Sequence, residues 1–193
     1  VLQKIGLHRA HVQLTPFLER FQAAKDNGFE FVEFWNWTDK DLDAVKAAAE
    51  KAGIGISGFN GDADLSLIDP EHKGRTWLFS AGRGGGEEGG AQSVTIHSNG
   101  LENGGIVINH YDKLSDTVKL CAMFDTLKEY AKLAEESGVL MNLEPLNVTT
   151  DHVGNFLQTT RMAAETTRLI GFQTKVLYDV YHMQLNEGSL CDN

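Results

Sequence analysis

Residues 139–184 contain two short apolar runs separated by an amphipathic segment of helical length, and this order constrains the fold more than any other feature. The first run ends at Glu144 and the second ends at Asp179. A strand, a helix and a second strand in this order join neighbouring parallel strands, almost always through a right-handed crossover. Because parallel neighbours end at the same edge of their sheet, we expect Glu144 and Asp179 to lie side by side.

Two carboxylates at the ends of apolar strands repel each other and are costly to remove from water. A divalent cation between them removes both penalties, and oxygen ligands suit a hard ion such as Mg²⁺ or Mn²⁺. We therefore predict one divalent cation as cofactor, with Glu144 and Asp179 as metal ligands. The alternatives are structural: Glu144 as a salt-bridged carboxylate before the Pro145 turn, and Asp179 as the N-cap of a helix.

Strand-like and helix-like segments alternate strictly through the first part of the chain. They are a strand at Leu2–Leu7, a helix opened by Thr15 and Pro16, a strand at Phe29–Phe34, a helix at Asp39–Ala52 and a strand at Ile54–Phe59. Each strand-helix unit takes about 26 residues. Alternation of this kind predicts a parallel sheet with helices on its outside.

The segment Gly82–Gly90 interrupts this pattern because it holds six glycines. Each glycine costs roughly 1 kcal/mol in a helix interior relative to alanine. We therefore predict a broken helix or a loop at this position. A phosphate-binding loop is not favoured, since no Lys-Ser or Lys-Thr pair follows the glycines.

The remaining elements extend the alternation to six units. They are a strand at Ser93–His97, a helix from Ser115 to Ser137, and a helix at Phe156–Ile170 between the strands that end at Glu144 and Asp179. The long loop before Ser115 is predicted to form a lid or a wall of a pocket. The sequence thus indicates one parallel α/β domain over residues 1–193.

Composition narrows the class of function. A net charge of −10 without basic clusters argues against a nucleic-acid-binding surface and is compatible with a small-molecule enzyme. No apolar run has the length of a membrane span, and no signal-peptide pattern is present. Cys121 and Cys191 lack metal-type spacing and are interpreted as free thiols in a reducing compartment, so we expect a cytoplasmic location.

Two linked motifs carry a family resemblance. The motif Leu143–Asn147 reads Leu-Glu-Pro-Leu-Asn, and the motif Tyr178–Gln184 reads Tyr-Asp-Val-Tyr-His-Met-Gln, followed by Glu187-Gly188. Together they resemble the hydroxypyruvate isomerase family, which belongs to the xylose-isomerase-like barrels, as do ketose 3-epimerases. The resemblance implies a (β/α)₈ TIM barrel, whose eight units average about 31 residues each.

The resemblance also implies a ligand set for one divalent metal. In the family, a Glu that ends strand 5 and an Asp that ends strand 6 bind the metal, together with a Gln or His on strand 7 and a Glu on strand 8. Glu144 and Asp179 match the first two positions. The sequence ends before the other two, so we expect a barrel truncated to about six strand-helix units, with weak or no activity of its own.

The implied activity is that of a metal-dependent aldose-ketose isomerase acting on a small α-hydroxy carbonyl compound, either hydroxypyruvate-like or a sugar, through a cis-enediolate. Glu144 is the candidate catalytic acid/base, and His182 matches a histidine that contacts substrate oxygens. Asn147 and His97 are further candidates for substrate binding. The alternatives are that Asn147 supports its turn and that either histidine has a structural role.

Three other functions remain open. A ketose 3-epimerase keeps the barrel and changes the chemistry, and a non-catalytic barrel remnant would serve only as a binding module. An endonuclease specific for apurinic sites also shares the barrel, but the charge of −10 counts against it. Open edges at the first and last strands would favour pairing between copies of the chain, so a homo-oligomer is among the expected partners.

Overall fold

The computed structural model describes residues 16–61, 66–71, 91–102, 104–171 and 173–191. Its strands are β1 (Phe31–Phe34), β2 (Gly55–Asn60), β3 (Ser93–Ile96), β4 (Leu140–Leu143) and β5 (Thr174–Val176). Its helices are α2 (Glu19–Asp26), α3 (Leu42–Ala52), α5 (Asp116–Ser137), α6 (Thr160–Ile170) and α7 (Val180–Asn186). The predicted strand Leu2–Leu7 and the glycine-rich segment Gly82–Gly90 lie outside the described residues.

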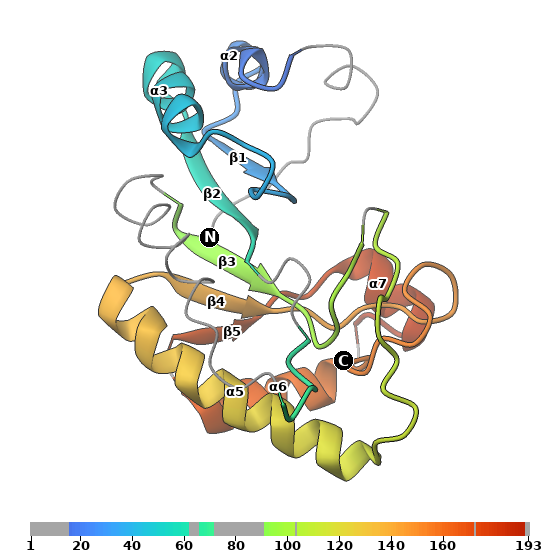
Figure 1. The fold of residues 1–193 in the computed structure, drawn as a ribbon. Coiled ribbons are helices and arrows are strands. Elements are labelled where there is room, and N and C mark those ends of the chain that lie inside the picture. The colour runs from blue at the N-terminus through green and yellow to red at the C-terminus, as the bar shows by residue number, and fades with distance from the viewer. Residues whose placement is uncertain (1–15, 62–65, 72–90, 103, 172, 192–193) are drawn as a thin grey trace.

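The five strands form one parallel sheet in the order β1-β2-β3-β4-β5, which confirms the predicted alternation (Figure 1). The register aligns Ile96 with Leu143 and Leu143 with Val176, so β3, β4 and β5 end at the same level. The segments that follow these strands gather with α7 beyond the carboxyl ends of the sheet (Figure 1). This edge holds the predicted site residues.

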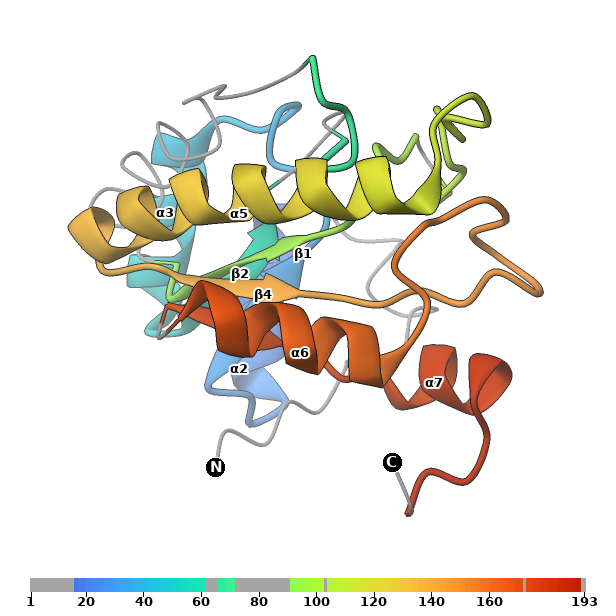
Figure 2. The ribbon, with the colours of Figure 1, turned by 90° about the horizontal axis from the view of Figure 1, so that it is seen from below.

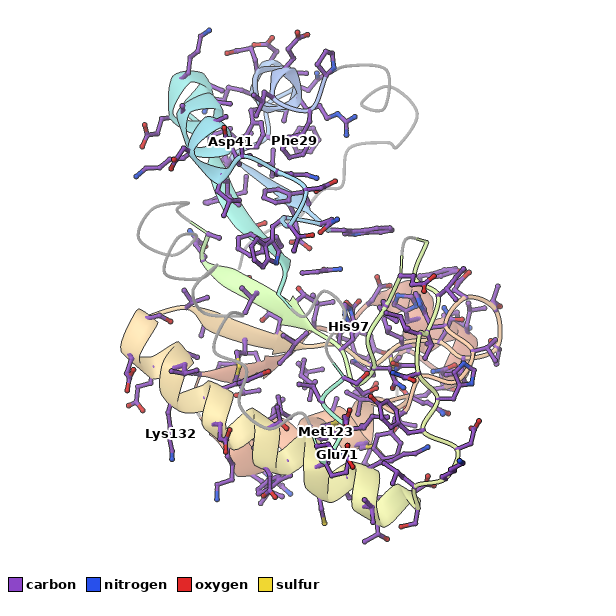
Figure 3. The ribbon with its side chains drawn as sticks, in the orientation of Figure 1. Phe29, Asp41, Glu71, His97, Met123 and Lys132 are labelled. Carbon is purple, nitrogen blue, oxygen red and sulfur yellow. The ribbon has the colours of Figure 1, made fainter. Side chains whose placement is uncertain are left out.

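Helices cover the sheet in two groups. Figure 1 shows α2 and α3 beside β1 and β2, and Figure 2 shows α5 and α6 lying together along the β4 side. On α5, Met123 is fully buried, whereas Lys132 is exposed on the outer side of the helix (Figure 3). The sheet contributes Met141 and Leu143 to the same core, where each fully buried side chain stabilises the fold by roughly 1.5–3 kcal/mol.

Local capping chemistry explains most helix ends. The Ser115 hydroxyl accepts a hydrogen bond from the backbone N–H of Val118 at the start of α5, as predicted. Gly138 ends that helix with a φ of 72°, a conformation that glycine adopts without steric cost. The helix predicted to begin at Asp39 begins at Leu42 instead, because Asp41 is its N-cap and the Asp41 carboxylate accepts from the Ala44 N–H.

Two further predicted helix starts are wrong. The helix expected to open at Pro16 begins at Glu19, because residues 16–20 form turns in which Glu19 N–H bonds to Pro16 O over three residues. The helix expected from Phe156 begins at Thr160. The N–H groups of residues 156 and 157 bond instead to the side chains of Asn99 and Ser98, which holds this segment as a loop.

Candidate active site

The ends of three neighbouring strands bring the candidate residues together. His97 follows β3 directly, Glu144 follows β4 directly, and Asp179 comes shortly after β5. The ladder continues past the strands, since Glu144 N–H bonds to Ile96 O at 3.1 Å and Leu177 N–H bonds to Leu143 O at 3.0 Å. Figure 3 shows His97 at this edge, beside the clustered loops. Backbone pairing therefore fixes the backbone positions from which these side chains extend.

Glu144 and His97 form a buried pair. The His97 Nε2 atom lies 3.1 Å from Glu144 Oε2, and the two residues are 3% and 9% exposed respectively. An ionised carboxylate only accepts hydrogen bonds, so the His97 ring nitrogen is the donor. The bond orients the Glu144 carboxylate and compensates part of the cost of burying it.

Glu144, Asp179 and His182 form a cluster in which one potential ligand atom of each residue lies within 4.8 Å of the others. The structure thus brings the two carboxylates together, as the strand order predicts. Glu144 Oε1 and His182 Nε2 are 3.9 Å apart, which is too long for a hydrogen bond. Two carboxylates with oxygen atoms within 4.8 Å of each other are a donor set that fits a hard divalent cation.

Asp179 also caps α7, which was the structural alternative for this residue. Its Oδ1 atom accepts hydrogen bonds from the N–H groups of Tyr181 at 2.7 Å and His182 at 3.3 Å. Both capping bonds use Oδ1, so the cap and a bond from Oδ2 to a cation are compatible. The cap also places His182 in the first turn of α7, facing Glu144.

Asn147 is fully buried behind His182. Its Oδ1 atom accepts from the N–H groups of Thr150 at 3.2 Å and Asp151 at 3.0 Å. Its Nδ2 atom lies 2.9 Å from Asp151 Oδ2 and 2.8 Å from His182 Nδ1. The side chain thus supports its turn and contacts the ring of a second candidate residue.

Asp151 and Tyr181 are members of the site that the sequence analysis did not select. The Tyr181 hydroxyl donates to Asp151 Oδ2 at 2.7 Å. Hydrogen bonds from Asn147 and then from Tyr181 hold the pKa of the Asp151 carboxyl below its usual value, and the bond to Asp151 raises the pKa of Tyr181. The available signal was the turn composition Asn-Val-Thr-Thr-Asp, since Asn favours such turns through side-chain bonds to nearby backbone.

His152 joins the loop after β4 to the loop after β3. Its Nδ1 atom donates to the carbonyl oxygen of Gly105 at 2.6 Å, and its ring meets the edge of the His182 ring at 5.1 Å between centroids. Burial is the largest of the causes that lower the pKa of His152. Asp151, His152 and His182 also have potential ligand atoms within 4.8 Å of one another. The loop after β3 therefore forms a wall of the site.

His110 lies apart from this cluster. It lines a cavity of about 560 Å³ near the start of α5, together with Lys119, Gly154 and Phe156. The lining residues of this cavity include none of Glu144, Asp179 and His182.

A search of the described helices for a membrane-spanning segment finds none with the required length and apolar character.

The fold and the site define an α/β protein with sequentially ordered parallel strands and a cluster of polar side chains at their carboxyl ends. Residues 21–193 match the model of one family, described as the xylose isomerase-like TIM barrel. The chain belongs to this family. The comparison with curated protein sequences gives no significant match.

Several solved structures share the fold. An AP endonuclease of family 2 from Brucella melitensis superposes with a TM-score of 0.74 at 21% identity, over 93% of this chain and 69% of that chain. D-psicose 3-epimerase from Clostridium cellulolyticum H10, solved with D-tagatose, gives 0.65 at 18% identity, over 91% and 62%. The IOLI protein with a bound zinc atom gives 0.66 at 16% identity, over 90% and 60%. The chain thus spans about two thirds of the length of these structures.

Proposed function

We propose that the protein is a metal-dependent isomerase that moves a proton between adjacent carbons of a small α-hydroxy carbonyl compound, either hydroxypyruvate-like or a sugar. The observation that carries the proposal is the cluster of Glu144, Asp179 and His182 at the carboxyl edge of the sheet. Active sites of TIM-barrel enzymes are built at this edge. Named relatives of this fold include epimerases that act on sugars.

Glu144 and Asp179 are the residues that would hold the cation. A bound Mg²⁺ or Mn²⁺ supplies Lewis-acid polarisation of a carbonyl oxygen, which lowers the pKa of the neighbouring C–H bond. Two carboxylates give the all-oxygen environment that these ions prefer. Their mutual repulsion in a largely buried site adds a reason to bind a positive charge.

Glu144 acts as the base in this proposal. Its carboxylate takes the proton from the carbon that carries the hydroxyl group, and the electron pair of the C–H bond forms the double bond of an enediolate. Return of a proton to the neighbouring carbon, with transfer of the hydroxyl proton to the former carbonyl oxygen, gives the isomer. The bond from His97 at 3.1 Å holds Glu144 in one orientation, which keeps its reach to the carbon constant.

His182 donates a hydrogen bond to a substrate oxygen on which negative charge develops. Its Nε2 atom lies 3.9 Å from Glu144 Oε1, so a substrate oxygen that accepts from Nε2 would lie near the Glu144 carboxylate. His97 and Asn147 were the other candidates for substrate binding. The geometry supports an indirect role for both residues. His97 would act by orienting its hydrogen-bond partner Glu144, and Asn147 would act by orienting its partner His182.

The activity is tested by proton exchange in heavy water. The intact protein with Mg²⁺ or Mn²⁺ is incubated with hydroxypyruvate and a panel of aldoses and ketoses, and deuterium at each carbon is followed by NMR. Isomerisation labels the carbon that receives the proton and changes the position of the carbonyl group. Epimerisation returns the proton to the same carbon and leaves the carbonyl group in place, so the assay separates these two activities.

Glu144→Gln is expected to slow the exchange by at least about 100-fold, because the amide is not a base. Glu165→Gln is the matched control, since Glu165 is an exposed residue of α6 whose carboxylate pairs with Arg161 on the same helix, and its variant should exchange at the wild-type rate. Equal rates in wild type and Glu144→Gln, or no exchange with any compound, would contradict the proposal and favour a binding module. Cleavage of DNA containing abasic sites would instead favour the endonuclease.

A further inference from the structure

The side-chain amide of Asn147 has no unused hydrogen-bonding capacity. An amide oxygen accepts two bonds and an amide nitrogen donates two. The oxygen is used by the N–H groups of Thr150 and Asp151, and the nitrogen is used by Asp151 Oδ2 and His182 Nδ1. Since Asn147 is fully buried, water is not an alternative partner. Each of the four bonds therefore constrains the others.

The orientation of this amide is determined by its neighbours. Backbone N–H groups only donate, so the side of Asn147 that faces Thr150 and Asp151 must carry the oxygen. The opposite side carries the nitrogen, where the Asp151 carboxylate accepts one of its two protons. Asp151 is itself held by the Tyr181 hydroxyl at 2.7 Å. A flipped amide would lose all of these bonds and place its oxygen against a carboxylate.

His182 must therefore accept at Nδ1. The second proton of the amide nitrogen points at this atom over 2.8 Å, and only an unprotonated ring nitrogen accepts it. A neutral imidazole that is unprotonated at Nδ1 carries its proton at Nε2. The Nε2 atom faces Glu144, so the group presented to the candidate active site is an N–H donor.

We propose that Asn147 is a positioning residue that holds His182 in the Nε2–H tautomer, so that His182 binds a substrate oxygen as a donor and does not ligate the cation. The catalytic consequence rests on the proposed function, whereas the tautomer follows from the hydrogen bonds alone. His182 has the position of a possible ligand, but its tautomer leaves no lone pair at Nε2. The substrate must then place an oxygen acceptor against His182 Nε2, close to the Glu144 carboxylate.

The first test is the tautomer of the wild-type protein. In intact protein labelled with ¹⁵N-histidine, protonated and unprotonated ring nitrogens have well-separated ¹⁵N shifts, and His182→Gln identifies the signals of His182. At neutral pH we expect a protonated Nε2 and an unprotonated Nδ1, both before and after addition of Mg²⁺. A protonated Nδ1, or a shift of Nε2 to the unprotonated range when Mg²⁺ is added, would overturn the proposal.

The second test changes Asn147 to Asp, which has nearly the same shape but only acceptor atoms. The new carboxylate faces both the Asp151 carboxylate and Nδ1 of His182, and the combined negative charge should draw a proton onto Nδ1. Asn99→Asp is the matched control, because Asn99 is also fully buried and also accepts a backbone N–H bond, from Phe156. We expect protonation of Nδ1 in Asn147→Asp and the wild-type tautomer in Asn99→Asp. Any other pair of results contradicts the proposal.

Activity provides a separate readout. Loss of an orienting partner typically costs about 10- to 100-fold, so kcat of Asn147→Asp should fall by this factor while KM changes much less. If Asn147→Asp does not fold, the wild-type tautomer still decides the proposal. A wild type with the expected tautomer but without proton exchange on any compound would refute the proposed function and leave the positioning role of Asn147 intact.

Discussion

At the scale of single residues, the site consists of polar groups held by defined hydrogen-bond partners. Glu144 accepts from His97, His182 accepts from Asn147, and Asp151 accepts from Tyr181. Because His97, Glu144 and Asn147 are buried, a missing partner at any of them would leave an expensive unpaired atom. Burial of His152 likewise makes protonation of its ring a measurable contribution to the free energy of unfolding.

The pH dependence of stability should include a contribution from His152. Its pKa in the folded protein is lowered from 6.5 by burial, so the unfolded chain takes up the proton first as the pH falls. The free energy of unfolding therefore decreases from above pH 6.5 down through the lowered pKa. Urea unfolding at pH 7.5 and pH 5.5 should show a smaller loss for His152→Gln than for wild type. Equal losses would contradict this assignment.

At the scale of elements, sequence patterns predicted the caps that depend on nearby residues and failed where tertiary contacts decide. Helix α5 begins after Ser115 and ends before Gly138 as predicted, because both caps depend only on nearby backbone. The start of α6 was wrong, since Ser98 and Asn99 bind the N–H groups just before it from far along the chain. Propensity contains no information on such partners.

The loop after β3 offers a paired test of its contact with His152. Gly104 and Gly105 have φ values of 88° and 80°, so alanine at either position costs about 1–2 kcal/mol of backbone strain. A Cβ atom at Gly104 meets nothing within 4 Å, whereas a Cβ atom at Gly105 overlaps the His152 ring. Gly105→Ala should therefore lose about 1–3 kcal/mol more than Gly104→Ala in urea unfolding. Equal losses would mean that the ring moves aside freely.

At the scale of the whole molecule, the parallel topology and the meeting of Glu144 with Asp179 were predictable because crossover geometry determines both. The hydrogen bond between Asn147 and His182 was not, since it joins residues 35 positions apart and depends on atomic orientation. Membership of the xylose isomerase-like TIM barrel family agrees with the resemblance carried by the two motifs.

A cation at this edge would bridge β4 and α7, so its binding should stabilise the whole fold. A ligand at about 100 times its Kd adds about 2.7 kcal/mol to the free energy of unfolding. Asp179→Asn keeps a good N-cap and should unfold like wild type without metal. The increase in its free energy of unfolding on addition of Mn²⁺ should be smaller than that of wild type by about 1.4 kcal/mol or more, which corresponds to tenfold weaker binding.

Urea unfolding with and without Mn²⁺ measures this difference. Asp116→Asn in the first turn of α5 is the control, because Asp116 lies outside the cluster and its variant should gain as much as wild type. If Mn²⁺ stabilises Asp179→Asn as much as it stabilises wild type, Asp179 does not bind the ion.

The burial of Asn147 has a further consequence for how the protein can be made. Asn147-Val148-Thr149 is an acceptor sequence for N-linked glycosylation, a modification that belongs on exposed loops of secreted proteins. An oligosaccharide attached to the nascent chain would occupy the amide nitrogen that bonds to Asp151 and His182, in a space with no exposed surface. Production through a eukaryotic secretory route would therefore yield chains that cannot close this site.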